Sequence, residues 1–406
     1  MTGLLSALLA LGAGVLALPA LALLVLTLAA GRRPPGPVEA GSGAAGSAPG
    51  LPARPRVAVL VPAHNESRHV LPTIACLRPQ LGPRDRLLVV ADNCSDDTAA
   101  LAREAGATVV ERFDASLRGK GYALAFGVDA LRADPPDVVF VIDADCVLSE
   151  GAIARVAPEC AAAGRPVQML NLMHAAPGAG VRHRVLEFAM VMKNLVRPLG
   201  SFRLGGACHL MGTGMALPWS LMSTARLATG HIAEDMKLGV ELAVAGHPAR
   251  FSLGGEVSSA FPDDSGTART QKSRWEHGHL AILTEELPRV LGLAWRTRRP
   301  ALAVMALDLM IPPLALYGLV LGAAVALSLL GAWLWPGLVP AAQVLLLGLA
   351  ATVLAVGLGW WRYGRHLLRA RELLSTPLYA LWKLPVYVAY ALQRRSGWVR
   401  TRRKDE

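Results

Sequence analysis

The chain has 406 residues, of which 53% are hydrophobic and only 17% are charged. This balance excludes an ordinary soluble domain of the same length and indicates that part of the chain lies in a membrane. The formal net charge of +11 does not indicate nucleic-acid binding, because Lys and Arg gather beside apolar stretches with few aromatics, which favours anionic lipid.

The first element is an uninterrupted apolar run without charge at residues 4–30. Because roughly 20 apolar residues cross a hydrocarbon core as a helix, the run predicts a transmembrane anchor over residues 1–31. A cleaved signal peptide is the alternative, but the run lacks a basic start and is longer than the usual signal core. Arg32 and Arg33 follow the run, and by the positive-inside rule they hold the next segment in the cytoplasm.

A segment rich in Pro, Gly, Ala and Ser follows at residues 32–55, and we expect a flexible linker because such residues cannot bury a core. Over residues 56–295, short β-branched runs alternate with helical periodicity. This alternation predicts a cytosolic α/β domain with a mostly parallel sheet flanked by helices. The cysteines of this domain lack metal-binding spacing and are expected to be reduced thiols: Cys76, Cys94, Cys146, Cys160 and Cys208.

Three strands are expected at residues 56–61, 86–91 and 138–142, and each leads into a polar cluster that contains carboxylates. In an open α/β sheet, ligands bind at the carboxyl ends of the strands. The three clusters therefore predict one site at one edge of the sheet. Taken alone, each cluster is also typical of a surface turn or a helix cap.

Asp143 and Asp145 stand two residues apart at the end of the third expected strand, so their side chains point roughly the same way. Mg²⁺ or Mn²⁺ on a pyrophosphate is commonly held by one or two carboxylates together with the phosphate oxygens. The pair therefore predicts a metal site for a nucleoside diphosphate. Similar pairs close many surface strands, so the prediction depends on their position beside the other clusters.

Residues 182–199 place apolar side chains between basic ends. This pattern is typical of an amphipathic helix that lies on the membrane beside the entrance for an acceptor. A helix packed in the protein core fits the pattern equally well. The sequence does not separate these two interpretations.

Two apolar runs at residues 301–331 and 339–361 predict a transmembrane hairpin over residues 300–362. Arginines flank both outer ends, which agrees with the orientation given by the N-terminal anchor. Asp308 is unusual inside such a run, because a carboxylate in lipid is costly. It lies near the cytoplasmic end, so we expect it to be interfacial.

Residues 363–406 contain one more apolar stretch, at 376–392, which carries Lys383 and Pro385 and has basic residues on both sides. A helix that crossed the membrane at residues 376–392 would place one of these basic flanks outside the cell. We therefore favour an interfacial or re-entrant helix over a third C-terminal membrane segment. The basic tail that follows returns to the cytoplasm in this interpretation.

Seven short motifs follow one another in the domain: Val-Pro-Ala-His-Asn-Glu (61–66), Asp-Asn-Cys-Ser-Asp-Asp-Thr (92–98), Arg-Gly-Lys-Gly (118–121), Asp-Ala-Asp (143–145), Gly-Thr-Gly (212–214), Glu-Asp (234–235) and Gln-Lys-Ser-Arg-Trp (271–275). None is specific alone. In this order the chain resembles inverting family 2 glycosyltransferases of the membrane-bound polysaccharide synthase branch, similar to poly-N-acetylglucosamine, hyaluronan and cellulose synthases and ceramide glucosyltransferases. The resemblance runs from residue 55 to about 290 and implies a nucleotide-sugar-binding domain of the GT-A type.

The resemblance implies how a donor is bound. Asp92 would accept a hydrogen bond from the base, and Glu66 would contact the ribose. Lys120, between two glycines, would lie near the phosphates, with Asp143 on the ribose side and Asp145 on Mg²⁺ or Mn²⁺. The implied donor-binding residues are Pro62, Glu66, Asp92, Lys120, Asp143 and Arg274.

The resemblance also implies the chemistry. Asp235 would act as the general base for an acceptor hydroxyl, with Glu234 beside it and Arg274 neutralising the departing diphosphate. Both carboxylates also suit a helix N-terminus, where the helix dipole favours negative charge. The implied acceptor-binding residues are Gly212, Thr213, Gly214, Gln271 and Trp275.

Together these features predict a multi-pass inner-membrane enzyme that transfers a sugar from a nucleotide-sugar donor, UDP-linked by the resemblance, to a polysaccharide or lipid-linked acceptor. Membrane lipid and subunits of an export system are the further partners expected, and nucleic acid is not. A non-processive lipid glucosyltransferase of the ceramide or hopanoid type is the alternative. A non-catalytic nucleotide-binding subunit of a secretion complex is less favoured, because the acidic and Gln/Arg/Trp motifs are intact.

Overall fold

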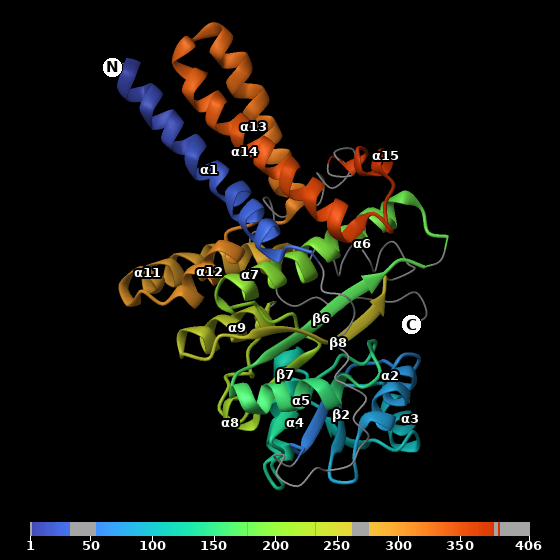
Figure 1. The fold of residues 1–406 in the computed structure, drawn as a ribbon. Coiled ribbons are helices and arrows are strands. Elements are labelled where there is room, and N and C mark those ends of the chain that lie inside the picture. The colour runs from blue at the N-terminus through green and yellow to red at the C-terminus, as the bar shows by residue number, and fades with distance from the viewer. Residues whose placement is uncertain are drawn as a thin grey trace.

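The computed structural model describes residues 2–32, 54–176, 178–231, 233–261, 276–376 and 381. Most of the expected linker, the motif at residues 271–275 and nearly all of the tail after residue 376 lie outside these ranges. Figure 1 shows two parts, a sheet covered by helices and a group of long helices that extends away from it.

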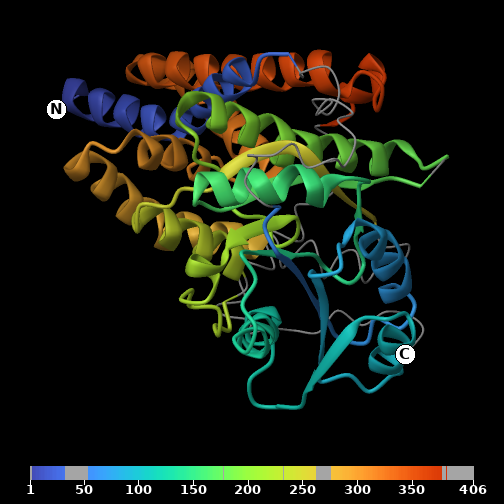
Figure 2. The same ribbon diagram turned by 60° about the horizontal axis from the view of Figure 1, so that its bottom comes forward.

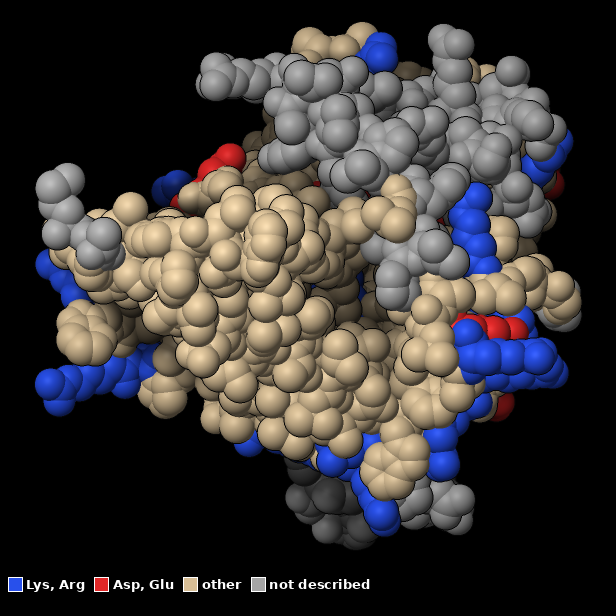
Figure 3. All heavy atoms as spheres, turned by 90° about the horizontal axis from the view of Figure 1, so that it is seen from above, with Lys and Arg blue, Asp and Glu red and all other residues tan. Residues whose placement is uncertain are grey.

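Three helices in the described ranges are long and apolar enough to cross a membrane: α1 (Thr2–Ala30), α13 (Leu314–Leu334) and the helix Pro336–Gly364, which contains α14 (Val339–Gly359). They run side by side (Figure 1). The Tyr317 hydroxyl of α13 donates to the Leu16 carbonyl of α1 at 2.9 Å. Seen from above, the described surface of this part is largely uncharged, and Lys and Arg side chains lie at its edges (Figure 3). This distribution suits a lipid environment bordered by headgroups.

The apolar run expected as one helix at residues 301–331 is two helices, so this prediction was wrong. It is divided into α12 (Pro300–Leu309) and α13, with Pro312 and Pro313 between them. Proline lacks a backbone N–H, and its ring clashes with the preceding turn, which ends a helix. At about 1.5 Å per residue, α12 is roughly 15 Å long and too short to span. The hairpin consists of α13 and α14.

The sheet has eight strands in the order β3-β2-β1-β4-β7-β6-β8-β5. Strands β1 to β4 form a parallel half, β7 runs antiparallel to both β4 and β6, and β5 runs antiparallel to β8. The sheet is therefore mixed. The strand bounds are β1 Val57–Ala63, β2 Arg86–Asp92, β3 Thr108–Arg112, β4 Val138–Val141, β5 Val147–Leu148, β6 Val167–His174, β7 Met215–Pro218 and β8 Arg250–Ala260.

Side chains alternate between the two faces along β1, as a pleated strand requires. Val59 packs with α2, α3 and α5 on one face, and Leu60 packs with α4, α6 and α7 on the other. Both faces are buried, which is why the strands are continuous apolar runs. The helices of this domain are α2 Val70–Leu77, α3 Thr98–Glu104, α4 Lys120–Leu131, α5 Ala152–Ala163, α6 Val181–Val191, α7 Arg197–Gly205, α8 Trp219–Met222, α9 Glu234–Val244 and α11 Leu287–Thr297.

Helices α6 and α7 are joined by a π-helical turn, η2 (Met192–Val196), into one helical run. Figure 2 shows this run between the sheet and the membrane helices. Phe188 and Leu195 are buried there, in one cluster with Leu23 and Leu26 of α1. Of the two interpretations of residues 182–199, the packed helix is the one observed.

The crossing of α1 and α7 depends on Gly200. A Cβ atom at Gly200 would lie 2.1 Å from the Leu26 carbonyl oxygen of α1. Any side chain at Gly200 would therefore force the backbones of α1 and α7 apart. We expect Gly200→Val to destabilise the protein by about 3 kcal/mol, the upper end for overpacking, because backbone cannot yield as a side chain does. Thermal unfolding in detergent measures this, with Gly292→Val as the control because Gly292 has open space around it. Equal midpoints in the two variants would contradict the prediction.

Candidate functional site

The loops that follow β1 and β2 are fastened to each other. The His64 Nδ1 atom lies 2.6 Å from the Asp92 carbonyl oxygen. Asn65 Nδ2 donates to the Ser95 hydroxyl at 3.1 Å, and Asn65 Oδ1 accepts from the Ser95 amide at 2.8 Å. Asn65 has a φ of 54°, a left-handed conformation that Asn adopts more readily than most residues. The first two motifs therefore form one rigid edge of the sheet.

Asp92 is 7% exposed at this edge, and its carboxylate is fixed by two neighbours. Arg112 Nη1 donates to Asp92 Oδ1 at 2.7 Å, and Asn93 Nδ2 donates to the same oxygen at 3.1 Å. The Arg112 guanidinium also lies over the Tyr122 ring, 5.6 Å from its centroid. The sequence reasoning missed Arg112. A buried carboxylate needs such a partner to stay ionised.

Asp143 and Asp145 directly follow β4, as the strand pattern predicts. The Asp143 amide donates to the Thr213 hydroxyl at 3.1 Å, which ties the pair to the 212–214 motif. Ligand atoms of Asp143, Asp145 and Cys146 all lie within 4.8 Å of one another. Among the described residues this is the one group of three that could hold a metal ion.

The donor atoms of this group fit a hard divalent cation. Burial raises the pKa of the Cys146 thiol well above its usual range, and the carboxylates of Asp143 and Asp145 raise it further. The thiol is therefore protonated in the absence of a metal ion, and a neutral thiol is a poorer ligand for a hard cation than a carboxylate. The two carboxylates offer oxygen atoms, which Mg²⁺ and Mn²⁺ prefer.

Lys120 begins α4 and brings three parts of the site together. Its Nζ atom forms an ion pair with Asp143 Oδ1 and donates to the Gly212 carbonyl oxygen at 2.9 Å. Burial lowers the pKa of Lys120, but the carboxylates of Asp143, Glu234 and Asp235 outweigh burial and raise it above the ordinary value. The lysine is therefore charged at neutral pH. Its positive charge offsets the negative charges of these three carboxylates.

The 212–214 motif is held from behind by Gln168, a fully buried residue that sequence reasoning missed. Gln168 Nε2 donates to the Thr213 carbonyl at 2.9 Å, and Gln168 Oε1 accepts from the Met211 amide at 2.8 Å. Thr213 is itself buried, and its hydroxyl already serves the Asp143 amide. Of this motif, Gly212 reaches the open site.

Glu234 and Asp235 form the first turn of α9. A Cβ atom at Gly212 would lie 3.1 Å from Asp235 Oδ2 and 3.4 Å from Lys120 Nζ, so Gly212 lies against both groups. Its φ of 83° also favours glycine. The pKa of Glu234 is raised to about 7, mainly by burial and then by the charge of Asp235, while Lys120 acts to lower it.

The raised pKa of Glu234 makes stability depend on pH. Between its ordinary value of 4.5 and about 7, the folded protein keeps a proton that the unfolded chain has lost. The contribution of Glu234 to the free energy of unfolding is therefore largest below pH 4.5 and is lost as the pH rises toward 7. Over this range we expect the free energy of unfolding of the wild type to fall by on the order of 2–3 kcal/mol, and we expect the Glu234→Gln variant to lack this fall. Thermal midpoints of both proteins from pH 4.5 to 8 measure it, and parallel profiles would contradict it.

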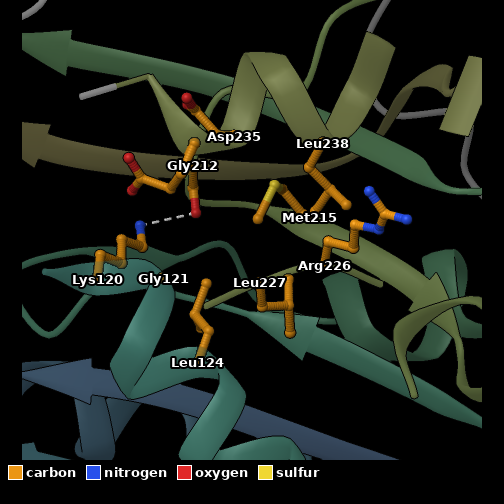
Figure 4. A pocket seen from close by; sticks show the side chains of 10 residues that line it. Lys120, Gly121, Leu124, Gly212, Met215, Arg226, Leu227, Asp235 and Leu238 are labelled. Atoms are coloured by element: carbon orange, nitrogen blue, oxygen red, sulfur yellow. Dashed lines mark hydrogen bonds between the residues drawn. The ribbon is translucent and has the colours of Figure 1, made fainter. Parts of the chain in front are cut away.

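These residues surround a hollow beside the strand ends. Its lining residues are Lys120, Gly121, Leu124, Gly212, Met215, Arg226, Leu227, Glu234, Asp235 and Leu238. Lys120, Gly212 and Asp235 gather at one end, while Leu124, Leu227, Leu238, Met215 and Arg226 lie toward the other (Figure 4). A Cβ atom at Gly121 would lie 2.3 Å from the Leu227 carbonyl oxygen, so only glycine lets the loop at 227 close this hollow.

The sequence of residues 55–278 matches a family profile described as glycosyltransferase like family 2. The match covers more than half of the chain. The chain belongs to glycosyltransferase-like family 2. It is thus a glycosyltransferase, and none of the curated proteins compared with it matches.

Two solved structures are similar to this glycosyltransferase. The mannosyltransferase PcManGT from Pyrobaculum calidifontis, in complex with GDP-Man and Mn²⁺, is 18% identical with a TM-score of 0.50, and the alignment covers 94% of this chain and 99% of that one. Glucosyl-3-phosphoglycerate synthase from Mycobacterium tuberculosis, in complex with Mn²⁺, UDP and phosphoglyceric acid, is 20% identical with a TM-score of 0.35 and coverages of 55% and 78%. The first likeness shows that this chain shares the fold of a GT-A mannosyltransferase, in an alignment that covers 94% of its length.

The remaining predicted residues of the glycosyltransferase divide into two groups. Pro62 and Glu66 lie at the end of β1 and in the loop after it, where the Glu66 amide donates to the Thr98 hydroxyl at 2.8 Å. The 271–275 motif, with its predicted donor and acceptor residues, lies outside the described ranges: Gln271, Arg274 and Trp275. The helical segment that follows, from residue 276, contacts the same domain, and its Ile282 is buried with α9.

Proposed function

We propose that this glycosyltransferase moves a sugar, with inversion, from a nucleotide-sugar donor to an acceptor held at the cytoplasmic face of the cell membrane. One observation carries the proposal. Lys120 pairs with Asp143 and bonds to the Gly212 carbonyl, and a Cβ atom at Gly212 would lie 3.1 Å from Asp235 Oδ2 and 3.4 Å from Lys120 Nζ. The carboxylates proposed for donor and acceptor thus come together beside Lys120 and Gly212.

On the donor side, Asp145 and Asp143 would hold Mg²⁺ or Mn²⁺, which neutralises charge on the departing diphosphate. Asp92 and Glu66 flank the place for the nucleoside, which we propose is uridine. Helix α4 connects this edge to Lys120. Lys120 begins α4, and Tyr122 of the same helix lies under the guanidinium of Arg112, which pairs with Asp92. The GDP-mannose and Mn²⁺ of the PcManGT complex agree with a nucleotide-sugar and metal site in this fold.

On the acceptor side, an acceptor hydroxyl oxygen would attack the anomeric carbon as the bond to the diphosphate breaks. Its proton would pass to Asp235, the general base. Glu234, with its pKa near 7, would share the negative charge of this turn, and Arg274 would neutralise the diphosphate. Gly212, Gln271 and Trp275 would contact the acceptor, with Thr213 and Gly214 shaping the loop behind Gly212.

The membrane part supports an acceptor that stays at the membrane surface. The arginines at both outer ends of the hairpin, and Arg32 after α1, support a cytoplasmic position for the catalytic domain by the positive-inside rule. Helix α1 packs on α7 of the catalytic domain, with Leu26 and Gly200 at the crossing. We propose a multi-pass protein of the inner membrane that acts in exopolysaccharide or envelope biosynthesis, with export subunits as its partners.

A lipid acceptor is the second candidate, and a specific observation favours it. The described residues contain three helices that could span a membrane. Three helices are few for enclosing a channel through which a long polymer is secreted. A non-processive transferase that glycosylates a lipid needs no such channel.

The test is a donor panel with product identification. Purified protein in membrane lipid is incubated with labelled UDP- and GDP-sugars and Mg²⁺ or Mn²⁺, and the labelled product is identified by mass spectrometry. A polymer supports the synthase, and a single glycolipid supports the lipid transferase. Binding of nucleotide without transfer or hydrolysis would instead identify a non-catalytic subunit and overturn the proposal.

A further inference from the structure

Asp308 of α12 is one of the most buried carboxylates in the described part of the chain, at 3% exposure. Its two carboxylate oxygens have different partners. Arg197 Nε donates to Oδ1 at 2.7 Å, and His209 Nδ1 bonds to Oδ2 at 2.6 Å. The Arg197 Nη2 atom also donates to the Asp308 carbonyl oxygen at 2.7 Å. The expectation of an interfacial Asp308 was therefore wrong, because its carboxylate, near the end of α12 at Leu309, is buried in protein against Arg197 and His209.

These contacts join three elements. Arg197 begins α7, which packs on the membrane helix α1. His209 lies three residues before Gly212, in the loop that Gln168 and the Asp143 amide hold. Asp308 lies on α12, which leads through the proline pair into α13. The network thus connects the start of the hairpin to the loop beside the proposed base.

Helix α12 also supports the base helix α9 directly. Met236 and Val240 of α9 are buried in one cluster with Met305 and Leu309 of α12. Helix α9 also meets the same loop, since a Cβ atom at Gly239 would lie 3.1 Å from the Leu210 amide nitrogen. Helix α12 therefore touches both parts whose relative position matters, the helix that carries Asp235 and the loop that carries Gly212.

A buried ion pair of this kind is weak evidence for stability, because apolar residues of similar volume often stabilise a fold equally well. It does impose one geometry, since both carboxylate oxygens must meet fixed donors. Burial raises the pKa of Asp308, but Arg197 and His209 outweigh burial and hold the pKa far below its usual range. The carboxylate is therefore ionised at physiological pH.

We propose that Asp308 is a positioning residue for sugar transfer: from the membrane-side helix α12 it sets, through His209, the loop that places Gly212 against Asp235 and Lys120. The inference rests on the proposed function of that site. It adds that the position of α12, which leads into the hairpin, and the position of Asp235 are coupled through these contacts. Asp308 itself does not touch the reacting groups.

The first test is Asp308→Asn in the full-length protein in lipid. We expect kcat to fall about 10- to 100-fold, because displacements of about 1 Å cost this much, while the KM for the donor changes less than about threefold. The matched control is Glu372→Gln. Glu372 of α15 (Ala370–Leu373) pairs with Arg184 of α6 at 2.6 Å, which also joins the membrane part to the domain but lies away from the loop. Equal kcat losses in both variants would overturn the proposal.

The second test uses His209, which leaves the pair of Arg197 and Asp308 intact. Only the Nδ1 edge of the ring is bonded, since His209 Nε2 has no hydrogen-bond partner within the described ranges. Asparagine places an amide nitrogen near the Nδ1 position and should keep kcat within about threefold, whereas His209→Leu should lose about tenfold or more. Equal activity of the two variants would overturn the proposal.

Binding of UDP or GDP with Mn²⁺ serves as a readout that does not need turnover. We expect Asp308→Asn and His209→Leu to bind the nucleotide as tightly as the wild type does, because Asp145 and Asp92 lie outside the network. Lost binding together with lost kcat would show general disruption and overturn the positioning role. If the wild type itself transfers no sugar, the proposed function fails first, and that result is distinct from a failure of the inference.

Discussion

Replacing Asp145 with alanine is expected to abolish metal-dependent binding of a nucleoside diphosphate. Asp145 and Asp143 supply the oxygen ligands of the one described group that could hold a metal ion, and Asp143 already shares its charge with Lys120. Asp145 therefore carries most of the charge available to Mg²⁺ or Mn²⁺. Its loss should weaken binding of UDP or GDP on the order of 100-fold, or about 2.7 kcal/mol. Calorimetric titration of nucleotide at fixed Mn²⁺ measures the change.

Asp129→Ala is the control for this variant, because Asp129 is an exposed carboxylate of α4 that pairs with Arg132 on the surface. It should bind the nucleotide as the wild type does. Repeating both titrations with excess chelator separates metal-dependent from metal-independent affinity. Tight, metal-dependent binding by Asp145→Ala would show that the metal lies elsewhere and would remove the proposed donor site.

Strands β1, β2 and β4 of the parallel half, and the motifs at their ends, could be predicted from the sequence because they depend on local order, whereas the less buried β3 was not predicted. Buried parallel strands are continuous apolar runs, and each of the three predicted runs ended at a motif. The positions of Asp143 and Asp145 after β4 follow from this pattern alone. The family profile at residues 55–278 then confirmed the family that the order of the motifs suggested.

Contacts between distant parts of the chain could not be predicted in this way. Asp308 and its partners Arg197 and His209 are separated by 111 and 99 residues. From the sequence, a carboxylate near the end of an apolar run is equally compatible with a headgroup and with a buried partner. Only the fold shows that α12 stops short and lies against α7 and α9.

Supporting residues were missed for a similar reason. Arg112 ends an edge strand, where an arginine is ordinary, and only its position beside Asp92 gives it a role. Gln168 lies inside an apolar strand, and a buried amide in such a strand is the one signal that could have identified it. Its partners, Met211 and Thr213, lie in the segment that leads into the neighbouring strand β7 and are 43 and 45 residues away in the sequence.

Replacing Asp235 with asparagine is expected to abolish sugar transfer while nucleotide binding survives. Asparagine keeps the size of the side chain and the start of α9, but it cannot take the proton of the acceptor hydroxyl. General base catalysis contributes about 10²–10⁴-fold to a rate, so kcat should fall by that factor. Transfer is measured with the active donor found by the panel, and nucleotide affinity is measured in parallel by calorimetry.

Glu234→Gln is the matched comparison for Asp235→Asn, because both changes remove one carboxylate from the same helical turn. If the turn acts only through its total negative charge on Lys120, the two variants should lose similar activity. If Asp235 is the base, Asp235→Asn should be slower than Glu234→Gln by at least about tenfold. Full activity of Asp235→Asn would remove Asp235 as the base and leave Gly212 beside a carboxylate that only balances charge.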